Sequence, residues 1–184
     1  MRDLSLHILD LAQNSVRANA ALVEIMVSVD ESRLITITIR DDGSGMSDEL
    51  KERVTSPFAT TRTTRKVGLG IPLMMQNARL AGGDVRIDST LGQGTTLTAT
   101  LHGDSIDCLP LGDLAGTVVS LVSANPERPD FRLFCSSPKG SMDFDTREMR
   151  QALGNVPLNE PEITAWMLSA IQEEIEPIFG GVIL

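Results

Sequence analysis

The chain has few aromatic residues and little positive charge. Only 3% of its 184 residues are aromatic, with one tryptophan and no tyrosine, so it lacks side chains that could stack on nucleic-acid bases. Its net charge is −9, whereas proteins that bind polyanions through bulk electrostatics carry an excess of lysine and arginine. We therefore expect no nucleic acid among its partners, although a single phosphorylated ligand held by backbone donors is compatible with this charge.

Long apolar runs are also missing. No stretch approaches the roughly 18 apolar residues of a membrane span, and the N-terminus lacks an apolar segment followed by a small-residue cleavage site. This pattern predicts a cytoplasmic protein with no membrane partner. The two cysteines, Cys108 and Cys135, lack the CxxC spacing, which favours reduced thiols over a disulfide or a zinc site.

The first hundred residues alternate between helical and extended patterns. Apolar residues at helical spacing predict a helix over 3–19, and alternating residues predict a hairpin of two strands. An α/β two-layer sandwich, with helices on one face of a mixed sheet, accounts for the whole series. The expected elements are helices at 3–19, from 47 and at 71–81, strands at 22–29, 33–40, 84–89 and 95–101, and a long loop at 54–67.

Prolines become frequent after about residue 103, which predicts two domains, 1–102 and a small α/β appendage at 103–184. Residues 131–135 and 160–184 could form a dimer face or a second small core, so a homodimer stays open. The expected elements are a helix or strand near 114–124, strands near 131–136 and 141–145, and helices near 146–153 and 160–176.

Three polar residues share one face of the first expected helix. Asp10, Asn14 and Arg17 are spaced i, i+4 and i+7. A solvated helix face is the plain alternative for any one of them. Together they suit a Mg²⁺–phosphate site, in which Asn14 offers a carbonyl oxygen, Arg17 pairs with phosphate and Asp10 orients or deprotonates a water molecule.

A loop rich in acid and glycine follows the strand at 33–40. Asp41 ends the strand, where a carboxylate can accept a hydrogen bond from an exocyclic amine. Gly43 and Gly45 permit a positive φ and a close approach of the backbone to a flat ring. If the loop stood alone, an acidic turn that caps the next helix would be the favoured explanation.

Gly68, Leu69 and Gly70 precede the helix at 71–81, where bare N–H groups and the helix dipole receive anions. The loop before them concentrates hydroxyl groups and three cations, a composition suited to fold over a triphosphate; it includes Thr60, Thr61, Arg62 and Lys66. The turn at 92–95, taken alone, is typical of a hairpin bulge.

Taken in order, these segments resemble the ATP-binding domain of the superfamily of gyrase B, the ninety-kilodalton heat-shock chaperones, histidine kinases and MutL, known as the GHKL or Bergerat fold. The resemblance covers about residues 4–101. Residues 10–17 resemble its N box, 41–45 its G1 box, 57–62 its F box and the start of the ATP lid, 68–70 its G2 box, and 92–95 its closing glycine–threonine turn.

The resemblance implies ATP and Mg²⁺ as ligands. Asn14 would coordinate Mg²⁺, Asp41 would accept from the adenine amino group, and Thr95 would support adenine contacts through water. The other residues implied in nucleotide binding are Arg17, Gly43, Gly45 and Met46, the loop residues Thr60, Thr61, Arg62 and Lys66, and the phosphate-binding Gly68, Leu69 and Gly70.

The chain departs from the family pattern at three positions. Asp10 replaces the glutamate of the hydrolysing branches, and its shorter side chain puts water activation in doubt. Asp42 replaces a common asparagine and would add negative charge near the base. Lys66 replaces the first glycine of the lid motif and would bring a cation near the phosphates.

Three functions remain open. The first is a Mg²⁺-dependent ATP-binding protein or slow ATPase whose nucleotide state switches a surface for a protein partner. The second is a protein kinase acting in trans, similar to anti-sigma serine kinases or detached histidine-kinase catalytic domains; the third is a degenerate domain that only makes protein contacts. Because too few residues precede Asp10 for a dimerisation hairpin, and both His7 and His102 are expected to be structural, a complete sensor kinase is not expected.

Overall fold

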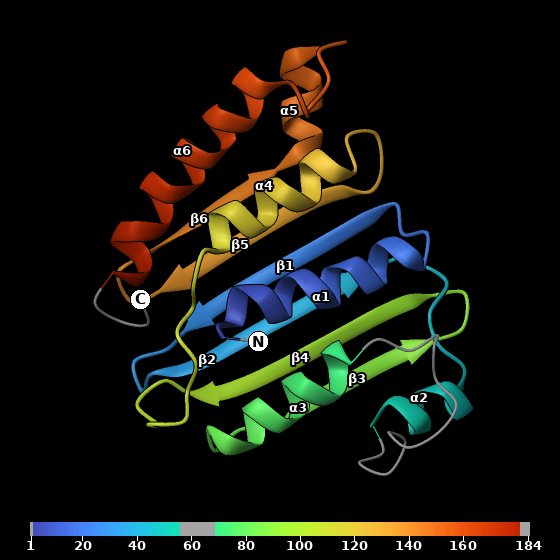
Figure 1. Ribbon diagram of the computed structural model, residues 1–184, viewed down its shortest axis with the longest axis vertical. Helices are drawn as coiled ribbons and strands as arrows, with labels where there is room; N and C mark the ends of the chain where they lie inside the picture. The colour runs from blue at the N-terminus through green and yellow to red at the C-terminus, as the bar shows by residue number, and fades with distance from the viewer. Residues whose placement is uncertain (1, 56–68, 181–184) are drawn as a thin grey trace.

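One mixed sheet runs through the chain in the order β3-β4-β2-β1-β5-β6 (Figure 1). The structure is a computed structural model and describes residues 2–55 and 69–180. Neighbouring strands are antiparallel, except that β5 pairs with β1 in parallel. The strands are β1 (Leu22–Val29), β2 (Leu34–Asp41), β3 (Val85–Thr90), β4 (Gly94–His102), β5 (Asp130–Ser137) and β6 (Gly140–Asp145).

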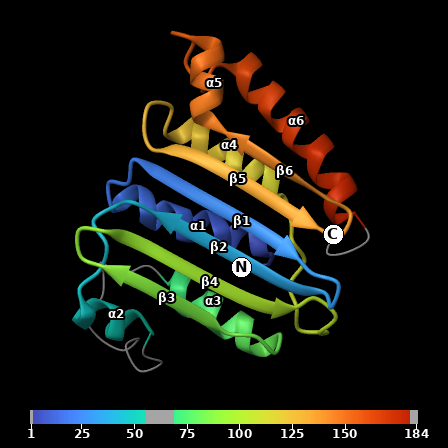
Figure 2. The same ribbon diagram turned by 180° about the vertical axis from the view of Figure 1, so that it is seen from behind.

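Helices cover one face of this sheet. Figure 1 shows α1, α3 and α4 in front of the strands and α6 along the β6 edge of the sheet, and Figure 2 shows the opposite face uncovered. The predicted two-layer fold is confirmed, and the segment near 114–124 is a helix. Residues 54 and 55, expected in the loop at 54–67, belong to α2 instead, and the rest of that expected loop lies outside the described residues. The helices are α1 (Leu4–Arg17), α2 (Asp48–Thr55), α3 (Gly70–Leu80), α4 (Leu114–Ala124), α5 (Thr146–Leu153) and α6 (Pro161–Phe179).

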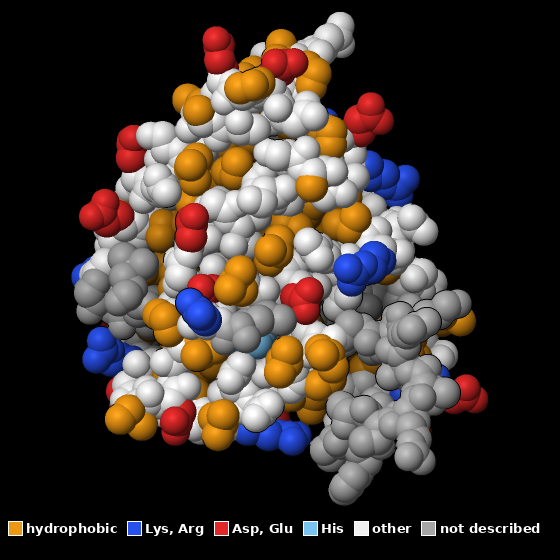
Figure 3. Space-filling view, in the orientation of Figure 1, with side chains coloured by type: hydrophobic (Ala, Val, Ile, Leu, Met, Phe, Trp, Pro, Cys, Tyr) orange, Lys and Arg blue, Asp and Glu red, His pale blue; other side chains and the backbone are white. Residues whose placement is uncertain are grey.

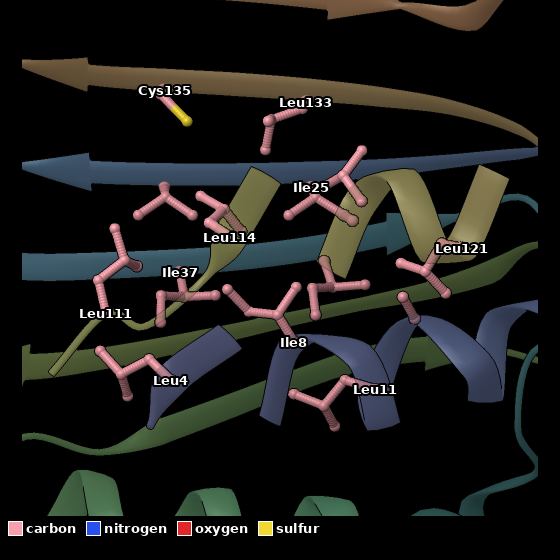
Figure 4. Packing of buried hydrophobic residues seen from close by; sticks show 14 of the residues in the cluster. Leu4, Ile8, Leu11, Ile25, Ile37, Leu111, Leu114, Leu121, Leu133 and Cys135 are labelled. Carbon is pink, nitrogen blue, oxygen red and sulfur yellow. The ribbon is translucent and has the colours of Figure 1, made fainter. Parts of the chain in front are cut away.

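The core lies between the sheet and α1. Residues alternate between buried and partly exposed along β1, as the period of a strand requires, so that Ile25 and Val27 face the helices. Leu4, Ile8 and Leu11 recur at i, i+4 and i+7 on α1 and are buried against them (Figure 4). Because these apolar residues of α1 turn toward the sheet, the other face of the helix is left for polar residues.

The N-terminus of α1 is tied to the second half of the chain. The first N–H groups of a helix have no partner within the helix. Here the N–H of Leu4 donates to the carbonyl of Pro110 at 2.9 Å, and the N–H of Ser5 donates to that of Leu111 at 2.8 Å. The Asp3 carboxylate caps the same turn by accepting from the N–H of Leu6. The segment after β4 therefore completes the start of α1.

Residues beyond 103 also join the first sheet and core. β5 extends the sheet by pairing with β1, and Leu114 and Leu121 of α4 are buried in the same cluster as α1 (Figure 4). The division into domains at 102/103 stays a prediction. The described residues on both sides of it share one sheet and one hydrophobic core.

Both cysteines are free thiols, as expected. Cys135 is buried in β5, and this burial raises the pKa of its thiol to about 12. Among the described residues, no helix is both long and apolar enough to cross a membrane.

Because α4 shares the core with α1, we predict that Leu114→Ala lowers the free energy of unfolding of the whole chain by about 2–4 kcal/mol. Urea unfolding, followed both by circular dichroism and by the fluorescence of the single tryptophan, Trp166, should give coincident transitions. Leu80→Ala is the control, since Leu80 is 55% exposed, and should cost less than about 0.5 kcal/mol. A separate, unchanged tryptophan transition would contradict the shared core.

Candidate functional site

A cleft of about 250 Å³ opens between α1, the end of β2 and the helices α2 and α3. Most of its wall is apolar, and its polar groups come from the C-terminal half of α1 and from the strand ends. It is lined by Leu11, Asn14, Ser15, Arg17, Ala18, Ile39, Asp41, Ser44, Gly45, Met46, Leu50, Val54, Ile71, Thr95 and Leu97.

Two cross-strand pairs form one wall of the cleft. In the register of β2 and β4, Asp41 lies opposite Thr95 and Ile39 lies opposite Leu97. Because side chains two residues apart on a strand point to the same face, all four project toward the helices. The sheet thus sets a carboxylate and a hydroxyl group beside an apolar surface.

Asp41 is a buried carboxylate, with 9% of its surface exposed. Its Oδ2 accepts from the Ser15 hydroxyl at 2.6 Å, and its Oδ1 accepts from the N–H of Gly43 at 2.9 Å. A carboxylate offers about four acceptor sites, so these two bonds hold the group in place and leave acceptor capacity for a ligand in the cleft.

Asn14 and Arg17 lie together at the cleft, as their spacing on α1 predicts. The Nη1 of Arg17 donates to the Oδ1 of Asn14 at 3.1 Å. Asp10 lies one turn toward the N-terminus of α1, half-buried and outside the cleft lining. A Cβ on Gly70 would be only 2.8 Å from the Asp10 Oδ2, so the start of α3 approaches this carboxylate closely.

Within the described part of the chain, no side chain caps the N-terminus of α3. Leu69 occupies the N-cap position and forms no capping hydrogen bond, while its side chain is 63% exposed. An uncapped helix N-terminus is where anions bind, and the predicted phosphate contact at Leu69 and Gly70 stays a prediction. The remaining predicted residues of this region, Thr60, Thr61, Arg62, Lys66 and Gly68, lie outside the described residues.

The glycines after β2 differ from the expectation in one respect. Gly45 has a positive φ of 62° and lines the cleft, but a Cβ there would lie 2.1 Å from the Thr90 carbonyl oxygen, so the close approach is to the β3–β4 turn. The φ of Gly43 is not positive, and a Cβ there would meet the backbone oxygen of Ala18 at 2.8 Å. Gly43 supports Asp41 from behind and does not line the cleft.

Ser89 connects the two loops at this end of the sheet. It is buried, accepts from the N–H of Met46 at 2.9 Å and donates to the Gly94 carbonyl at 3.0 Å. Its oxygen also lies 2.9 Å from the hydroxyl oxygen of Thr95. With its own proton on Gly94, Ser89 accepts from Thr95, which leaves the Thr95 hydroxyl as an acceptor toward the cleft.

Asp42 does not bring charge to the cleft, contrary to the expectation. Its Oδ1 accepts from the N–H groups of Ala21 at 2.7 Å and Leu22 at 2.9 Å, at the start of β1. Burial alone would raise the pKa of Asp42, but the hydrogen bonds from Leu22 and Ala21 outweigh burial and lower it. This residue holds β1 and does not line the cleft.

The family model described as histidine kinase-, DNA gyrase B-, and HSP90-like ATPase matches residues 2–105. The chain belongs to this family. Similar curated proteins include a sensor-like histidine kinase of Rhizobium meliloti, 33% identical over an alignment of 88 residues that covers 44% of this chain and 17% of the relative. The sensor histidine kinase WalK of Bacillus subtilis is 30% identical over an alignment of 100 residues that covers 50% of this chain and 16% of the relative. The chain thus spans less than a fifth of the length of these relatives.

A solved structure shares the fold of this ATPase family member. The N-terminal domain of a DNA repair protein matches with a TM-score of 0.53 and 16% identity, over 79% of this chain and 52% of that one. At this identity the likeness concerns the fold alone. This structural match covers more of the chain than the family model, which matches residues 2–105.

Sequence reasoning missed several residues of the ATPase-family cleft. Ser15 follows Asn14, and its hydroxyl donates to the Asp41 carboxylate at the end of β2. This contact depends on how α1 packs on the sheet, which the sequence pattern does not show. Ile39 carried a signal, because it shares the strand face of Asp41. Leu50 and Ile71 come from α2 and α3, whose relation to β2 is tertiary.

The structural role expected for His7 stays a prediction, and among the described residues only one of its ring nitrogens is bonded. It is fully buried on α1, and its Nε2 lies 2.8 Å from the Nδ2 of Asn77 on α3. Its Nδ1 is buried without a hydrogen-bond partner among the described residues. Burial is the main cause that lowers the pKa of His7. His102, by contrast, is exposed.

We predict that acid destabilises the fold through His7. Its pKa is lowered in the folded state, so on acidification from about pH 7.5 to 5.5 the unfolded chain binds the proton first, near the ordinary pKa of 6.5, and the free energy of unfolding falls. His7→Gln should flatten this pH dependence in thermal unfolding, whereas His102→Gln should preserve it. Equal slopes for the wild type and His7→Gln would contradict the assignment.

Proposed function

We propose that this chain binds ATP with Mg²⁺ in the cleft beside Asp41 and that its nucleotide state alters a surface for a protein partner. The observation that carries the proposal is the buried Asp41 carboxylate, held by Ser15 and Gly43 with acceptor capacity to spare. A pocket with apolar walls and a few converging polar groups is the usual form of a small-molecule site.

The chemistry of the cleft favours adenine over guanine. Apolar side chains such as Ile39 and Leu97 offer a surface for the face of a flat ring. Asp41 can only accept hydrogen bonds as a carboxylate, and the exocyclic amine of adenine donates. The carbonyl oxygen of guanine at the same ring position would instead oppose the carboxylate.

The donor set beside the base fits a divalent cation and phosphate groups. The Asn14 Oδ1 is the hard oxygen ligand that Mg²⁺ accepts, and Arg17 can pair with a phosphate. Mg²⁺, when bound, would neutralise charge on the phosphates. Asp10 lies one turn before Asn14 on α1, about 6 Å toward the N-terminus of the helix at 1.5 Å per residue. Its carboxylate is close to Gly70 at the start of α3. We infer that the nucleotide runs from the base at Asp41 toward the phosphate end at Asp10.

The switching part of the proposal rests on α1. This helix lines the cleft with Asn14 and Ser15, and it also contacts α4 and, through Leu4 and Ser5, the segment after β4. A ligand that shifts α1 would change the surface that residues beyond 103 present, provided it binds the two arrangements with different affinity.

A second candidate function is phosphoryl transfer to a protein in trans. Two observations favour it: the two curated relatives described above are histidine kinases, and a half-buried carboxylate, Asp10, lies at the inferred phosphate end. In this role Asp10 would accept the proton of a substrate hydroxyl or imidazole group. In the ATPase role it would orient water.

We predict that Asp41→Asn weakens the binding of a non-hydrolysable ATP analogue by at least about tenfold, because an amide donor then opposes the donors around it. Isothermal titration calorimetry in the presence of Mg²⁺ measures the change in affinity. GTP, titrated in the same way, should bind more weakly than the ATP analogue. Asp42→Asn is the matched control, since its Oδ1 can still accept from Ala21 and Leu22. Unchanged affinity in a folded Asp41→Asn variant would refute adenine recognition at Asp41.

We predict that Asp10→Asn abolishes phosphoryl chemistry while nucleotide affinity changes less than about threefold. Incubation with γ-labelled ATP separates the two functions, because released phosphate marks an ATPase and label on a second protein marks a kinase. Asp48→Asn, a change on the exposed side of α2, is the control. Full turnover by Asp10→Asn would exclude Asp10 as the proton acceptor.

A further inference from the structure

One face of α6 is exposed and carries the only tryptophan of the chain. Glu162, Trp166, Ser169 and Glu173 recur at i, i+4, i+7 and i+11, so they form a single stripe along the helix, and all are exposed. We call these four residues the α6 stripe. Trp166, near its centre, is 58% exposed, although burying the large apolar surface of an indole ring is energetically favourable. An exposed tryptophan of this kind is typical of contact surfaces.

The carboxylates of this stripe form no ion pair with any residue that the structure describes. α6 contains four glutamates and no lysine or arginine. Among the described residues, no cation forms an ion pair with Glu162 or Glu173; the Glu173 carboxylate accepts only from the hydroxyl of Ser169, at 2.8 Å. Figure 3 shows acidic side chains along the upper-left edge of the molecule, where Figure 1 draws α6.

A hollow lies at the N-terminal end of the stripe. It has a volume of about 640 Å³, and Glu160 and Glu162 are the acidic residues among those that line it. Glu160 holds the N-cap position of α6 but makes no capping hydrogen bond, so its carboxylate is not used by the helix. The other walls include Val156, which is 45% exposed, and Pro157. An apolar hollow with a carboxylate rim fits an arginine side chain, whose stem is apolar and whose head is charged.

We propose that the α6 stripe docks a cationic amphipathic helix of a protein partner. Arginines of that helix would pair with Glu162 and Glu173, which lie roughly 16 Å apart at 1.5 Å per residue. An apolar or cationic side chain between them would cover Trp166. The surface goes beyond the proposed nucleotide function, because α6 lies by β5 and β6 whereas the cleft lies by α1, α2 and β4.

Charge argues against a second copy of the chain as the occupant. In a two-fold symmetric contact the same patch meets itself, so Glu162 and Glu173 would face the glutamates of the other copy. The contact would then bury like charges without a counterion, which is costly. A cationic partner removes this cost.

The fluorescence of Trp166 gives a direct test, because the chain has no other tryptophan and no tyrosine. The probe is a synthetic helical peptide with two arginines and a leucine at the spacing of Glu162, Glu173 and Trp166. A peptide of the same composition in scrambled order serves as its control. Without nucleotide, the ordered peptide should shift the Trp166 emission to shorter wavelength and bind at least about fivefold more tightly than the scrambled one.

Two double variants with the same change in net charge separate docking from general attraction. Glu162→Gln/Glu173→Gln should weaken binding about five- to tenfold, whereas Glu31→Gln/Glu52→Gln, at exposed sites away from α6, should weaken it less than about twofold. Equal weakening by both, or binding without an emission shift, would overturn the proposal. An emission shift with protein concentration alone would assign the stripe to a second copy. Because no nucleotide is present, failure here leaves the ATP proposal untouched.

Discussion

The cleft depends on one buried carboxylate. Asp41 closes β2, and the bonds from Ser15 and Gly43 repay part of the cost of removing it from water. Those bonds join α1, the strand and the following loop at a single group. A carboxylate held so firmly offers its remaining acceptor sites in a fixed direction, which is the condition for recognising a donor on a flat base.

The loops around Asp41 are held by backbone contacts that only glycine permits. Gly45 packs against the carbonyl of Thr90, and Gly94, with a φ of 93°, packs against that of Asp41. The buried hydroxyl of Ser89 joins the same two loops. Backbone contacts and the Ser89 hydroxyl therefore fix the two loops beside Asp41, while side chains, most of them apolar, form the rest of the cleft wall.

Whether a prediction from the sequence agrees with the structure depends on how far apart in the chain the interacting residues lie. The helices, the strands and the shared face of Asn14 and Arg17 depend on neighbours within a few residues, and these predictions are confirmed. The prediction that Asp42 adds charge near the base was wrong, because its partners, the N–H groups of Ala21 and Leu22 at the start of β1, are distant in sequence. Gly43 does not use the positive φ that glycine permits, and its neighbour Ala18, just after α1, is likewise distant in sequence.

The sequence by itself determined the family, the order of the elements and the residues that carry polar groups to one end of the sheet, because periodicity and short motifs are local. Only the tertiary structure decided that β5 pairs with β1 and that Pro110 and Leu111 complete the start of α1. It also decided which apolar side chains enclose the cleft and that the stripe around Trp166 is left exposed. Those outcomes depend on contacts between segments far apart in the chain, which no local pattern records.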